Sequence, residues 1–383
     1  MELVKCTKCM MDLEKGVQIC PHCGYDQQRE DQPANALRRN TILRGRYLVG
    51  NVIGQGGFGI TYVGFDLVLE MKVAVKEYYP SATASRTANH SSRIQWDTRD
   101  EGEQMKGIER FVKEAQKMAK LDAVPSIVRV WDVFQENETA YIVMDFVEGV
   151  TLKQYLSEYG VMQWADCFAL LEPILESLAV MHDRGFIHRD ISPDNIMVQP
   201  DGTARLLDMG AAVDVRATQG QASMAVAKKN FSAPEQYTQT AALGSWSDVY
   251  GMAATMYYCL TGKVIPEAME RSFNKVPIRF PAEHPLPSHA AAALTRALEL
   301  ETNVRTRNMR EFKRQLASAG AAPGTTGTGG SGSGGGTVAS EHKEKNNAMP
   351  KSVKVIFVLV FALLALYYII WGVNRASAGG GLQ

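Results

Sequence analysis

Hydrophobic and polar positions divide residues 45–316 into a strand-rich first part and a helix-rich second part. In the first part, short apolar or alternating runs bounded by glycine and polar residues predict strands. These expected strands cover residues 47–53, 60–66, 72–77, 127–134 and 140–145. One helix is expected among the strands, so the pattern predicts an α+β protein.

The second part opens with a stretch over 164–183 in which apolar residues recur at helical spacing. This spacing predicts a long helix packed on a core. Pro173 lies inside the stretch and predicts a kink or a local break, because proline lacks the amide that the helix needs. Further helices are expected up to about residue 316.

Two segments of different character follow. Residues 317–350 are rich in Gly, Ser, Thr and Ala, and such a composition is typical of a flexible tether. Residues 353–373 contain 19 consecutive uncharged positions from Val355 to Val373, long enough for a transmembrane helix. The alternative is a buried core helix, which the tether and the missing polar face oppose. Four lysines lie within a dozen residues before Val355 and one arginine follows Val373, which predicts a cell-membrane protein with a single span. The large N-terminal part would then be cytoplasmic and residues 374–383 a short external tail.

Net charge is zero, since 41 basic residues balance 41 acidic ones. This balance argues against general nucleic-acid binding. The first residues contain no apolar run, so no signal peptide is expected.

Residues 1–26 contain two Cys-x-x-Cys pairs, which are formed by Cys6, Cys9, Cys20 and Cys23. Four thiolates in two close pairs suit tetrahedral Zn²⁺, and so small a module has too little core to fold without a metal. The alternative of two disulfides is weak in a reducing compartment. The pattern resembles small zinc ribbons with a structural Zn²⁺. His22 lies between ligands and is interpreted as a bystander, and 27–44 as a polar linker.

A glycine-rich run follows the first expected strand, and it reads Gly54-Gln55-Gly56-Gly57-Phe58-Gly59. Glycines allow backbone amides to approach phosphates. A dinucleotide fold would need a helix next, but residues 60–63 are strand-like, and no Gly-Lys-Ser/Thr follows as in a Walker loop.

A lysine in an apolar strand, Lys76 in Val73-Ala74-Val75-Lys76, is of the kind that contacts nucleotide phosphates. Such a lysine needs a carboxylate partner on a nearby helix. Glu114 is the stronger candidate because Phe111 and Met118 flank it on the apolar stripe of its helix, whereas Glu109 faces elsewhere.

The most specific pattern is His188-Arg189-Asp190-Ile191-Ser192-Pro193-Asp194-Asn195, followed by Asp208-Met209-Gly210. An aspartate, an asparagine and a second aspartate at this spacing suit a substrate hydroxyl and magnesium around a transferring phosphoryl group. Taken together, the motifs of residues 45–316 resemble those of eukaryotic-type serine/threonine protein kinases of the bacterial kind. Lys76-Glu77-Tyr78-Tyr79-Pro80 is similar to a Lys-Glu-Tyr-Phe-Pro signature of one bacterial subgroup.

The resemblance implies a bilobal fold with an N-lobe at 45–146 and a C-lobe at 149–316. It implies Mg·ATP-dependent phosphorylation of serine or threonine in protein substrates, with Asp190, Lys76 and Glu114 as catalytic residues. Asn195 and Asp208 would hold Mg²⁺, and the sequence leaves open whether Mn²⁺ replaces it. The implied ATP-binding residues are Ile53, Gly54, Gln55, Gly56, Gly57, Phe58, Gly59, Thr61, Ala74, Lys76, Met144, Asp145, Val147 and Met197.

The same resemblance assigns supporting roles. Arg189 would contact a phosphate on the activation segment, where Thr218 or Ser223 is expected to be phosphorylated. Glu235 of Ala233-Pro234-Glu235 would pair with Arg305, and Asp248 would brace the catalytic loop.

Three departures from the family pattern stand out. Ser192 occupies a position where these kinases usually carry a lysine that contacts the γ-phosphate, and we hypothesise that Lys228 or Lys229 folds back to replace it. Met209 replaces the usual phenylalanine. Residues 81–103 form a long polar loop, hypothesised to gate the Glu114 helix.

The departure at Ser192 keeps a second interpretation open, a catalytically silent scaffold, and a small-molecule phosphotransferase is a third. The sequence leaves the substrate and homodimerisation undecided.

Overall fold

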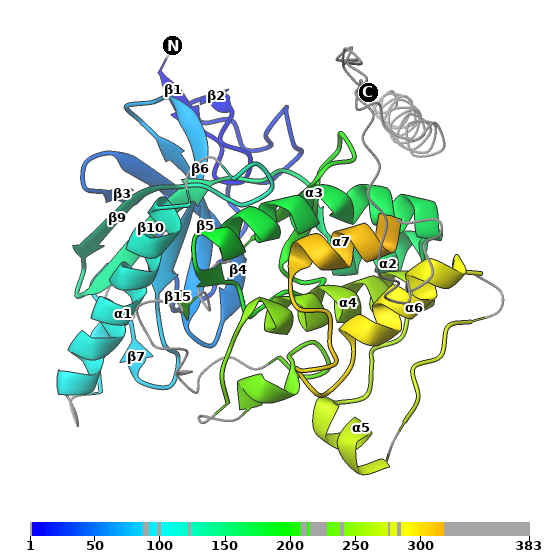
Figure 1. The fold of residues 1–383 in the computed structure, drawn as a ribbon. Helices are drawn as coiled ribbons and strands as arrows, with labels where there is room; N and C mark the ends of the chain where they lie inside the picture. The colour runs from blue at the N-terminus through cyan, green and yellow to red at the C-terminus, as the bar shows by residue number, and fades with distance from the viewer. Residues whose placement is uncertain are drawn as a thin grey trace, which may run out of the picture.

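The protein is described by a computed structural model that covers residues 2–86, 92–97, 101–121, 124–207, 213–214, 228–237, 241–274, 276–281 and 285–317. These residues form a β-rich lobe and a helical lobe, with a small cysteine-containing module beside the β-rich lobe (Figure 1). The α+β class expected from the hydrophobic pattern is therefore confirmed.

The first lobe is a six-stranded antiparallel sheet with the strand order β3-β4-β5-β6-β10-β9. One helix, α1, packs against it. Their bounds are Ile42–Leu43 (β3), Tyr47–Gly56 (β4), Gly59–Asp66 (β5), Met71–Tyr78 (β6), Val130–Glu136 (β9), Thr139–Asp145 (β10) and Glu101–Ala119 (α1).

Both faces of this sheet are covered, which explains the apolar run in β6. Val73 and Val75 point to one face, where the chain before β3 packs. Ala74 points to the other face, where it packs with Phe111 and Ala115 of α1. Because side chains alternate along a strand, Lys76 lies on the α1 side and Glu77 on the opposite side.

The second lobe is built mainly from helices: α2 (Leu152–Tyr159), α3 (Trp164–Asp183), α4 (Ser245–Thr261), α5 (Ala268–Asn274), α6 (Ser288–Ala297) and α7 (Met309–Ala317). Short strands β11 (Val150–Thr151), β12 (Phe186–Ile187), β13 (Ile196–Val198), β14 (Ala204–Leu206) and β15 (Val213–Asp214) border the catalytic loop.

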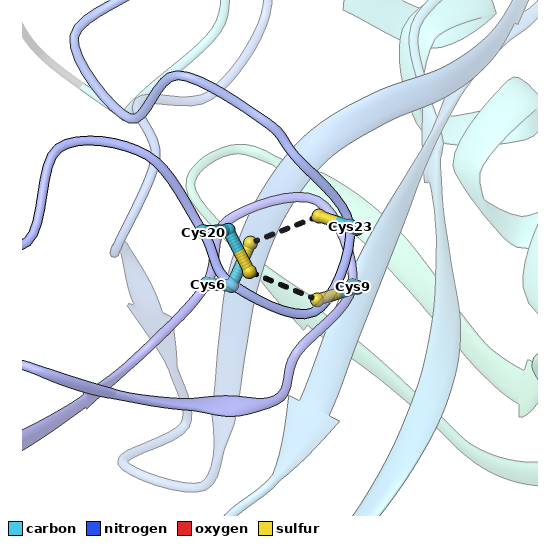
Figure 2. Close-up of side chains that lie close together, drawn as sticks. All are labelled: Cys6, Cys9, Cys20 and Cys23. Carbon is cyan, nitrogen blue, oxygen red and sulfur yellow. Dashed lines mark hydrogen bonds between the residues drawn. The ribbon is translucent and has the colours of Figure 1, made fainter. Parts of the chain in front are cut away.

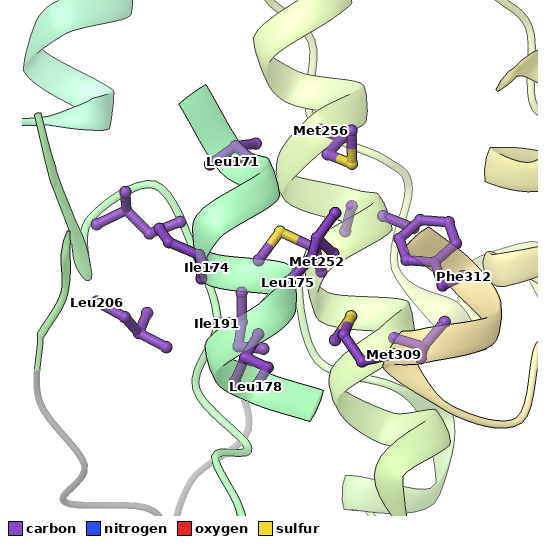
Figure 3. Packing of buried hydrophobic residues seen from close by; sticks show 14 of the residues in the cluster. Leu171, Ile174, Leu175, Leu178, Ile191, Leu206, Met252, Met256, Met309 and Phe312 are labelled. Carbon is purple, nitrogen blue, oxygen red and sulfur yellow. The ribbon is translucent and has the colours of Figure 1, made fainter. Parts of the chain in front are cut away.

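Helix α3 lies at the centre of this lobe. Its residues Leu171, Leu175 and Leu178 are fully buried and share one apolar cluster with Met252 of α4 and Phe312 of α7 (Figure 3). The long helix predicted at 164–183 is confirmed, but Pro173 does not break it. The helix runs on through this position.

The cysteine module contains a two-stranded hairpin, β1 (Leu3–Lys5) and β2 (Asp12–Glu14), which lies beside the N-lobe sheet (Figure 1). The Thr7 carbonyl accepts a hydrogen bond from the Asn51 amide in β4 at 2.7 Å. A β-carbon at Gly50 would collide with the Met10 side chain and the Thr7 carbonyl. The module is thus docked on the strand that leads into the glycine-rich turn.

The segment 27–44 differs from the expected linker. Ala36, Leu37 and Leu43 are buried in the N-lobe core, and β3 pairs with β4. This segment is therefore part of the lobe, because it supplies the apolar cover for one face of the sheet.

The expected polar loop at 81–103 also carries structure. It contains a short hairpin, β7 (Ala84–Ser85) with β8 (Gln95–Trp96), and α1 already begins at Glu101. Ile94 is buried, and Arg86 pairs with Glu77 in the interior.

The strand expected at 127–134 begins later, at Val130, and ends at Glu136. Ile127 instead forms an isolated parallel bridge with Leu206 of β14, so these first residues tie the two lobes together.

The membrane span predicted at 353–373 lies outside the described residues. Among the helices of the described ranges, none combines the length and apolar character needed to cross a bilayer.

Candidate active site and metal centre

The catalytic loop at 188–195 is held by a buried carboxylate from α4. Asp248 accepts hydrogen bonds from the backbone amides of His188 and Arg189, both at 2.8 Å, and from the His182 ring at 2.8 Å. Arg189 has a left-handed backbone with φ of 69°, a strained conformation that such anchoring can maintain. Burial alone would raise the pKa of Asp248, but these donors hold it below its ordinary value.

Within this loop, Asp190 and Asn195 contact each other directly. The Asn195 side-chain nitrogen donates to Asp190 Oδ2 at 2.7 Å and to the Asp190 carbonyl at 2.8 Å. Asp190 Oδ1 is buried and accepts no hydrogen bond from the described residues. An oriented carboxylate with one oxygen left over can accept a proton from a substrate hydroxyl.

The glycine-rich run forms the turn between β4 and β5. Gln55 pairs with Ile60 and Gly56 with Gly59, which leaves Gly57 and Phe58 at the tip. A β-carbon at Gly54, Gly56 or Gly57 would meet nothing within 4 Å, so the backbone there is open to a phosphate chain. At Gly59 a β-carbon would lie 2.6 Å from the Glu77 carbonyl, so only glycine fits there.

Lys76 and Glu114 approach the same side of the sheet. Lys76 follows Ala74 on the face covered by α1, and it pairs in register with Thr61. Glu114 is half-buried between the buried residues Phe111 and Met118, on the stripe that the sequence assigned to it. Its carboxylate lies close enough to Arg189 to oppose the lowering of the Arg189 pKa by burial.

An apolar cluster lies where a nucleotide base would be expected. Ala74, Met144 and Val147 are buried together, and Met197 packs against them. In the described part of the structure, no other backbone group bonds to the amide or carbonyl of Val147. Asp145 uses its carboxylate to accept from Trp131 Nε1 at 2.8 Å. Ile53 and Phe58 are exposed, with 49% and 66% of their surface accessible.

The Ala233-Pro234-Glu235 segment is anchored in the helical lobe. Arg305 donates to both carboxylate oxygens of Glu235, at 2.7 and 3.2 Å, and both residues are buried. Gln236 donates to the Arg189 carbonyl at 2.7 Å. The end of this segment is therefore bonded to the catalytic loop itself.

The side chain of Lys228 contacts Ser192. Its ammonium donates to the Ser192 hydroxyl at 2.9 Å and pairs with Asp194 at 2.7 Å. Lys229 points elsewhere and pairs with Glu267 at 2.8 Å.

Three candidate residues, Asp208, Thr218 and Ser223, lie outside the described residues, as does Met209. The residue before Asp208 is described. The Leu207 amide donates to the Asn195 carbonyl at 2.7 Å, and its carbonyl lies 3.3 Å from the His188 ring nitrogen.

The four N-terminal cysteines converge on one point (Figure 2). Their sulfurs all lie within 4.8 Å of one another, and the Cys6–Cys23 and Cys9–Cys20 pairs are both 3.7 Å apart. A tetrahedral zinc with bonds of about 2.3 Å requires sulfurs about 3.8 Å apart. All four are free thiols, which does not support the disulfide alternative.

The surroundings of the sulfurs favour a metal-binding thiolate at Cys6 and oppose deprotonation of two others when no metal is bound. Burial raises the pKa of the Cys9 and Cys23 thiols. Burial would do the same at Cys6, but backbone amides outweigh it and lower the Cys6 pKa to about 7. The side-chain nitrogen of Gln27 donates to Cys6 Sγ at 3.2 Å, and its oxygen accepts from the Thr7 amide at 3.1 Å.

Comparison with known families identifies the family to which the larger part of the chain belongs. A family model described as "Protein kinase domain" matches residues 47–280, more than half of the 383 residues. The chain belongs to the protein kinase family. Its glycine-rich turn, Lys76 strand and catalytic loop all lie within the matched range.

Several curated relatives of this kinase are similar in sequence. It is 30% identical over 58% of its length to the serine/threonine-protein kinase PrkC of Bacillus subtilis, of which it covers 31%. It is 29% identical over 73% of its length to pkn2 of Myxococcus xanthus, covering 33%. It is 31% identical over 58% of its length to PknL of Mycobacterium tuberculosis, covering 51%. The kinase thus spans a third to a half of these relatives.

A solved structure has the same fold. The kinase matches an apo form of PpkA-294 with a TM-score of 0.63 and 28% identity, over 74% of this chain and 99% of that one.

Sequence reasoning missed several residues of the kinase site. His182 and Gln236 were not singled out, although both hold the catalytic loop. Gln236 directly follows the Ala-Pro-Glu motif, which was a usable signal. No sequence signal marked Gln27 as a contact of Cys6, because glutamine is an ordinary surface residue.

Proposed function

We propose that this kinase transfers the γ-phosphoryl group of Mg·ATP to serine or threonine hydroxyls of protein substrates. The observation that carries the proposal is Asp190, whose carboxylate is fixed by Asn195 at one oxygen while the other is buried and accepts no bond from the described residues. The curated relatives, which are named serine/threonine-protein kinases, support the same substrate class.

The residues present fit Mg·ATP. Open backbone at Gly54, Gly56 and Gly57 suits the phosphates, and the apolar cluster around Ala74 and Met197 suits a flat base. When bound, ATP supplies the phosphoryl group and Mg²⁺ neutralises charge on its oxygens.

Each residue of the chain then has one task. Asp190 accepts the proton of the substrate hydroxyl, and Asp248 keeps the Asp190 loop in place through the amides of His188 and Arg189. Asn195, whose side-chain nitrogen is engaged by Asp190, would offer its oxygen to Mg²⁺ together with Asp208. Lys76, with Glu114 as its partner, would hold the α and β phosphates.

The test is phosphotransfer by the purified full chain in detergent, with labelled ATP, Mg²⁺ and a degenerate serine/threonine peptide library. We expect phosphoserine or phosphothreonine in the wild type and none above background in Lys76→Met. Label found only on small-molecule acceptors, or no transfer from a folded protein that binds ATP, would refute the proposal.

We further propose that residues 353–373 anchor the kinase in the membrane with its catalytic part in the cytoplasm. The uncharged run and the lysines before it support this topology. In cell fractions, the full chain should resist carbonate extraction, and a version ending at residue 350 should be released. Release of both would contradict the anchor.

We also propose that the four cysteines bind one structural Zn²⁺, which the 3.7 Å sulfur pairs support. Elemental analysis should find one zinc per chain, and a metal-free protein with intact folding of residues 1–26 would contradict this.

A further inference from the structure

Between Asp190 and Asn195, the catalytic loop of this chain carries no cationic side chain. Between Asp190 and Asn195 the side chains are those of Ile191, Ser192, Pro193 and Asp194, and Ser192 is completely buried. Transfer of a phosphoryl group gathers negative charge on its equatorial oxygens, and fixed positive groups beside it normally offset this charge. The neutral hydroxyl of Ser192 cannot do so.

A cation nevertheless reaches this place from another part of the chain. The Lys228 ammonium donates to the Ser192 hydroxyl at 2.9 Å and contacts the Asp194 carboxylate at 2.7 Å. Lys153 pairs with the same carboxylate at 3.1 Å. Burial would raise the pKa of Asp194, but the two lysines hold it below its ordinary value.

The Lys228 backbone is held firmly. Its amide donates to the Ser232 hydroxyl at 2.7 Å, and its carbonyl accepts from the Ser232 amide at 2.9 Å. This turn leads directly into Glu235, which Arg305 anchors in the helical lobe. Because its backbone is anchored in this way, the Lys228 charge is held in a defined position and does not depend on attraction to Asp194 alone.

We propose that Lys228 is a catalytic residue whose ammonium stabilises the transferring phosphoryl group. The ammonium lies on Ser192, which is two positions along the loop from Asp190. The inference rests on the proposed kinase function. An ammonium has three donors, and among the described residues Ser192 and Asp194 engage two of them, which leaves the third for a phosphate oxygen. About a third of the Lys228 side chain is solvent-accessible.

In this arrangement two different parts of the chain supply the hydroxyl and the ammonium. The loop supplies the hydroxyl, and the segment before Ala233-Pro234-Glu235 supplies the ammonium. Assembly of the active-site charge therefore depends on the anchoring of that segment. Lys229 has no such role, because its exposed ammonium pairs with Glu267.

The experiment compares full-chain variants in two assays. The first is the kcat of phosphotransfer. The second measures the gain in Mg·ADP affinity on adding aluminium fluoride, which mimics the transferring phosphoryl group. The variants are Lys228→Ala, Lys228→Gln, Lys229→Ala and the exchange variant Ser192→Lys/Lys228→Ser. Lys228→Gln removes the charge but keeps a hydrogen-bond donor, on a side chain that is one bond shorter.

We expect Lys228→Ala and Lys228→Gln to lower kcat by about 100-fold, since removing one donor to a developing charge has an effect of that order. Both should lose most of the affinity gain from aluminium fluoride while binding Mg·ADP as the wild type does. Lys229→Ala should stay within about twofold. The kcat of the exchange variant should be at least about tenfold higher than that of Lys228→Ala, because the exchange returns an ammonium to the same place.

Several results would overturn the inference. One is Lys228→Gln with wild-type kcat. Another is a loss of kcat with the aluminium fluoride gain unchanged and no recovery in the exchange variant, which would make Lys228 only a structural tie. These results presuppose an active wild type. A folded wild type without phosphotransfer would instead refute the proposed function, and this inference with it.

Discussion

Two buried carboxylates, Asp248 in the helical lobe and Glu77 in the β-rich lobe, are satisfied in opposite ways. Asp248 in the helical lobe accepts two backbone amides and one imidazole. Among the described residues, the partners of Glu77 in the sheet are all side chains: the Arg86 guanidinium and the hydroxyls of Tyr62 and Tyr141. Asp248 therefore fixes the path of the main chain at the active site.

The contacts of Glu77 affect a different part of the molecule. The Tyr62 hydroxyl that donates to it also accepts from the Leu37 amide at 2.9 Å, and Arg86 also donates to the Asn35 carbonyl at 2.5 Å. The cluster of Glu77, Arg86, Tyr62 and Tyr141 thus ties the segments before β3 and after β6 to the sheet. From this comparison we expect changes at Asp248 to affect catalysis and changes at Glu77 to affect the stability of the N-lobe.

The largest expected effect is that of Asp248→Ala. The change leaves two buried amides without acceptors, at about 1–3 kcal/mol each, and releases the strained backbone at Arg189. We expect kcat to fall by at least about 100-fold, because misplacing a catalytic group by about 1 Å has this effect. Steady-state kinetics would check it. The control Asp248→Asn keeps one acceptor oxygen and should retain more activity than Asp248→Ala. A fully active Asp248→Ala variant would contradict the difference drawn between Asp248 and Glu77.

The next effect should be on stability alone. Glu77→Gln leaves the Arg86 guanidinium buried without its counter-charge, which costs about 3–5 kcal/mol of unfolding free energy. Urea denaturation measures the loss. The double variant Glu77→Gln/Arg86→Met should recover most of it. At temperatures where the protein stays folded, kcat should remain within about twofold, and a kcat loss as large as that of Asp248→Ala would erase the distinction.

Metal removal tests how far the cysteine module acts on the N-lobe. Zinc supplies about 10–16 kcal/mol to the folding of modules this small, so Cys20→Ser should unfold the module and remove Thr7 from Asn51 of β4. We expect the zinc content to drop below one per chain. The kcat should fall by less than about tenfold, because only the strand before the glycine-rich turn is affected.

The matched control for this metal-site variant is His22→Ala, which changes an exposed side chain between the ligands. It should keep its zinc and its activity. Loss of zinc in the control would make His22 a ligand.

The smallest effect is the pH dependence of the Asp248 brace. The folded pKa of Asp248 lies below its unfolded value of about 3.9. The contribution of Asp248 to the free energy of unfolding is therefore fully present above the unfolded pKa, and it is lost as the pH falls through the folded pKa. The stability difference between wild type and Asp248→Asn should shrink below about pH 4. Urea denaturation between pH 3 and pH 6 would show this, and a difference that grows toward acid would contradict it.

The sequence predicted the helical-lobe site well because its residues lie in short contiguous motifs. The spacing from His188 to Asn195 already fixes which side chains share the loop, and Asp248 follows from a motif on α4. The catalytic assignments at Asp190, Lys76 and Glu114 and the Mg²⁺-binding assignments at Asn195 and Asp208 remain predictions of the sequence.

The N-lobe cluster escaped prediction because its partners are distant and unpatterned. Arg86 lies in a polar loop without periodicity, and Leu37 is one apolar residue in a polar stretch. Sequence likewise could not choose between Lys228 and Lys229, since adjacent residues differ only in the direction that the folded backbone gives them. The contact of Lys228 with Ser192 became visible only in three dimensions.

The central claim is that the half-satisfied carboxylate of Asp190 is the proton acceptor for a protein hydroxyl. The most direct measurement compares kcat for wild type and Asp190→Asn in the full chain, with Mg·ATP affinity measured alongside. We predict a fall in kcat of about 100-fold or more, with nucleotide affinity within about threefold of the wild type. Unchanged kcat in a folded Asp190→Asn protein would contradict the account.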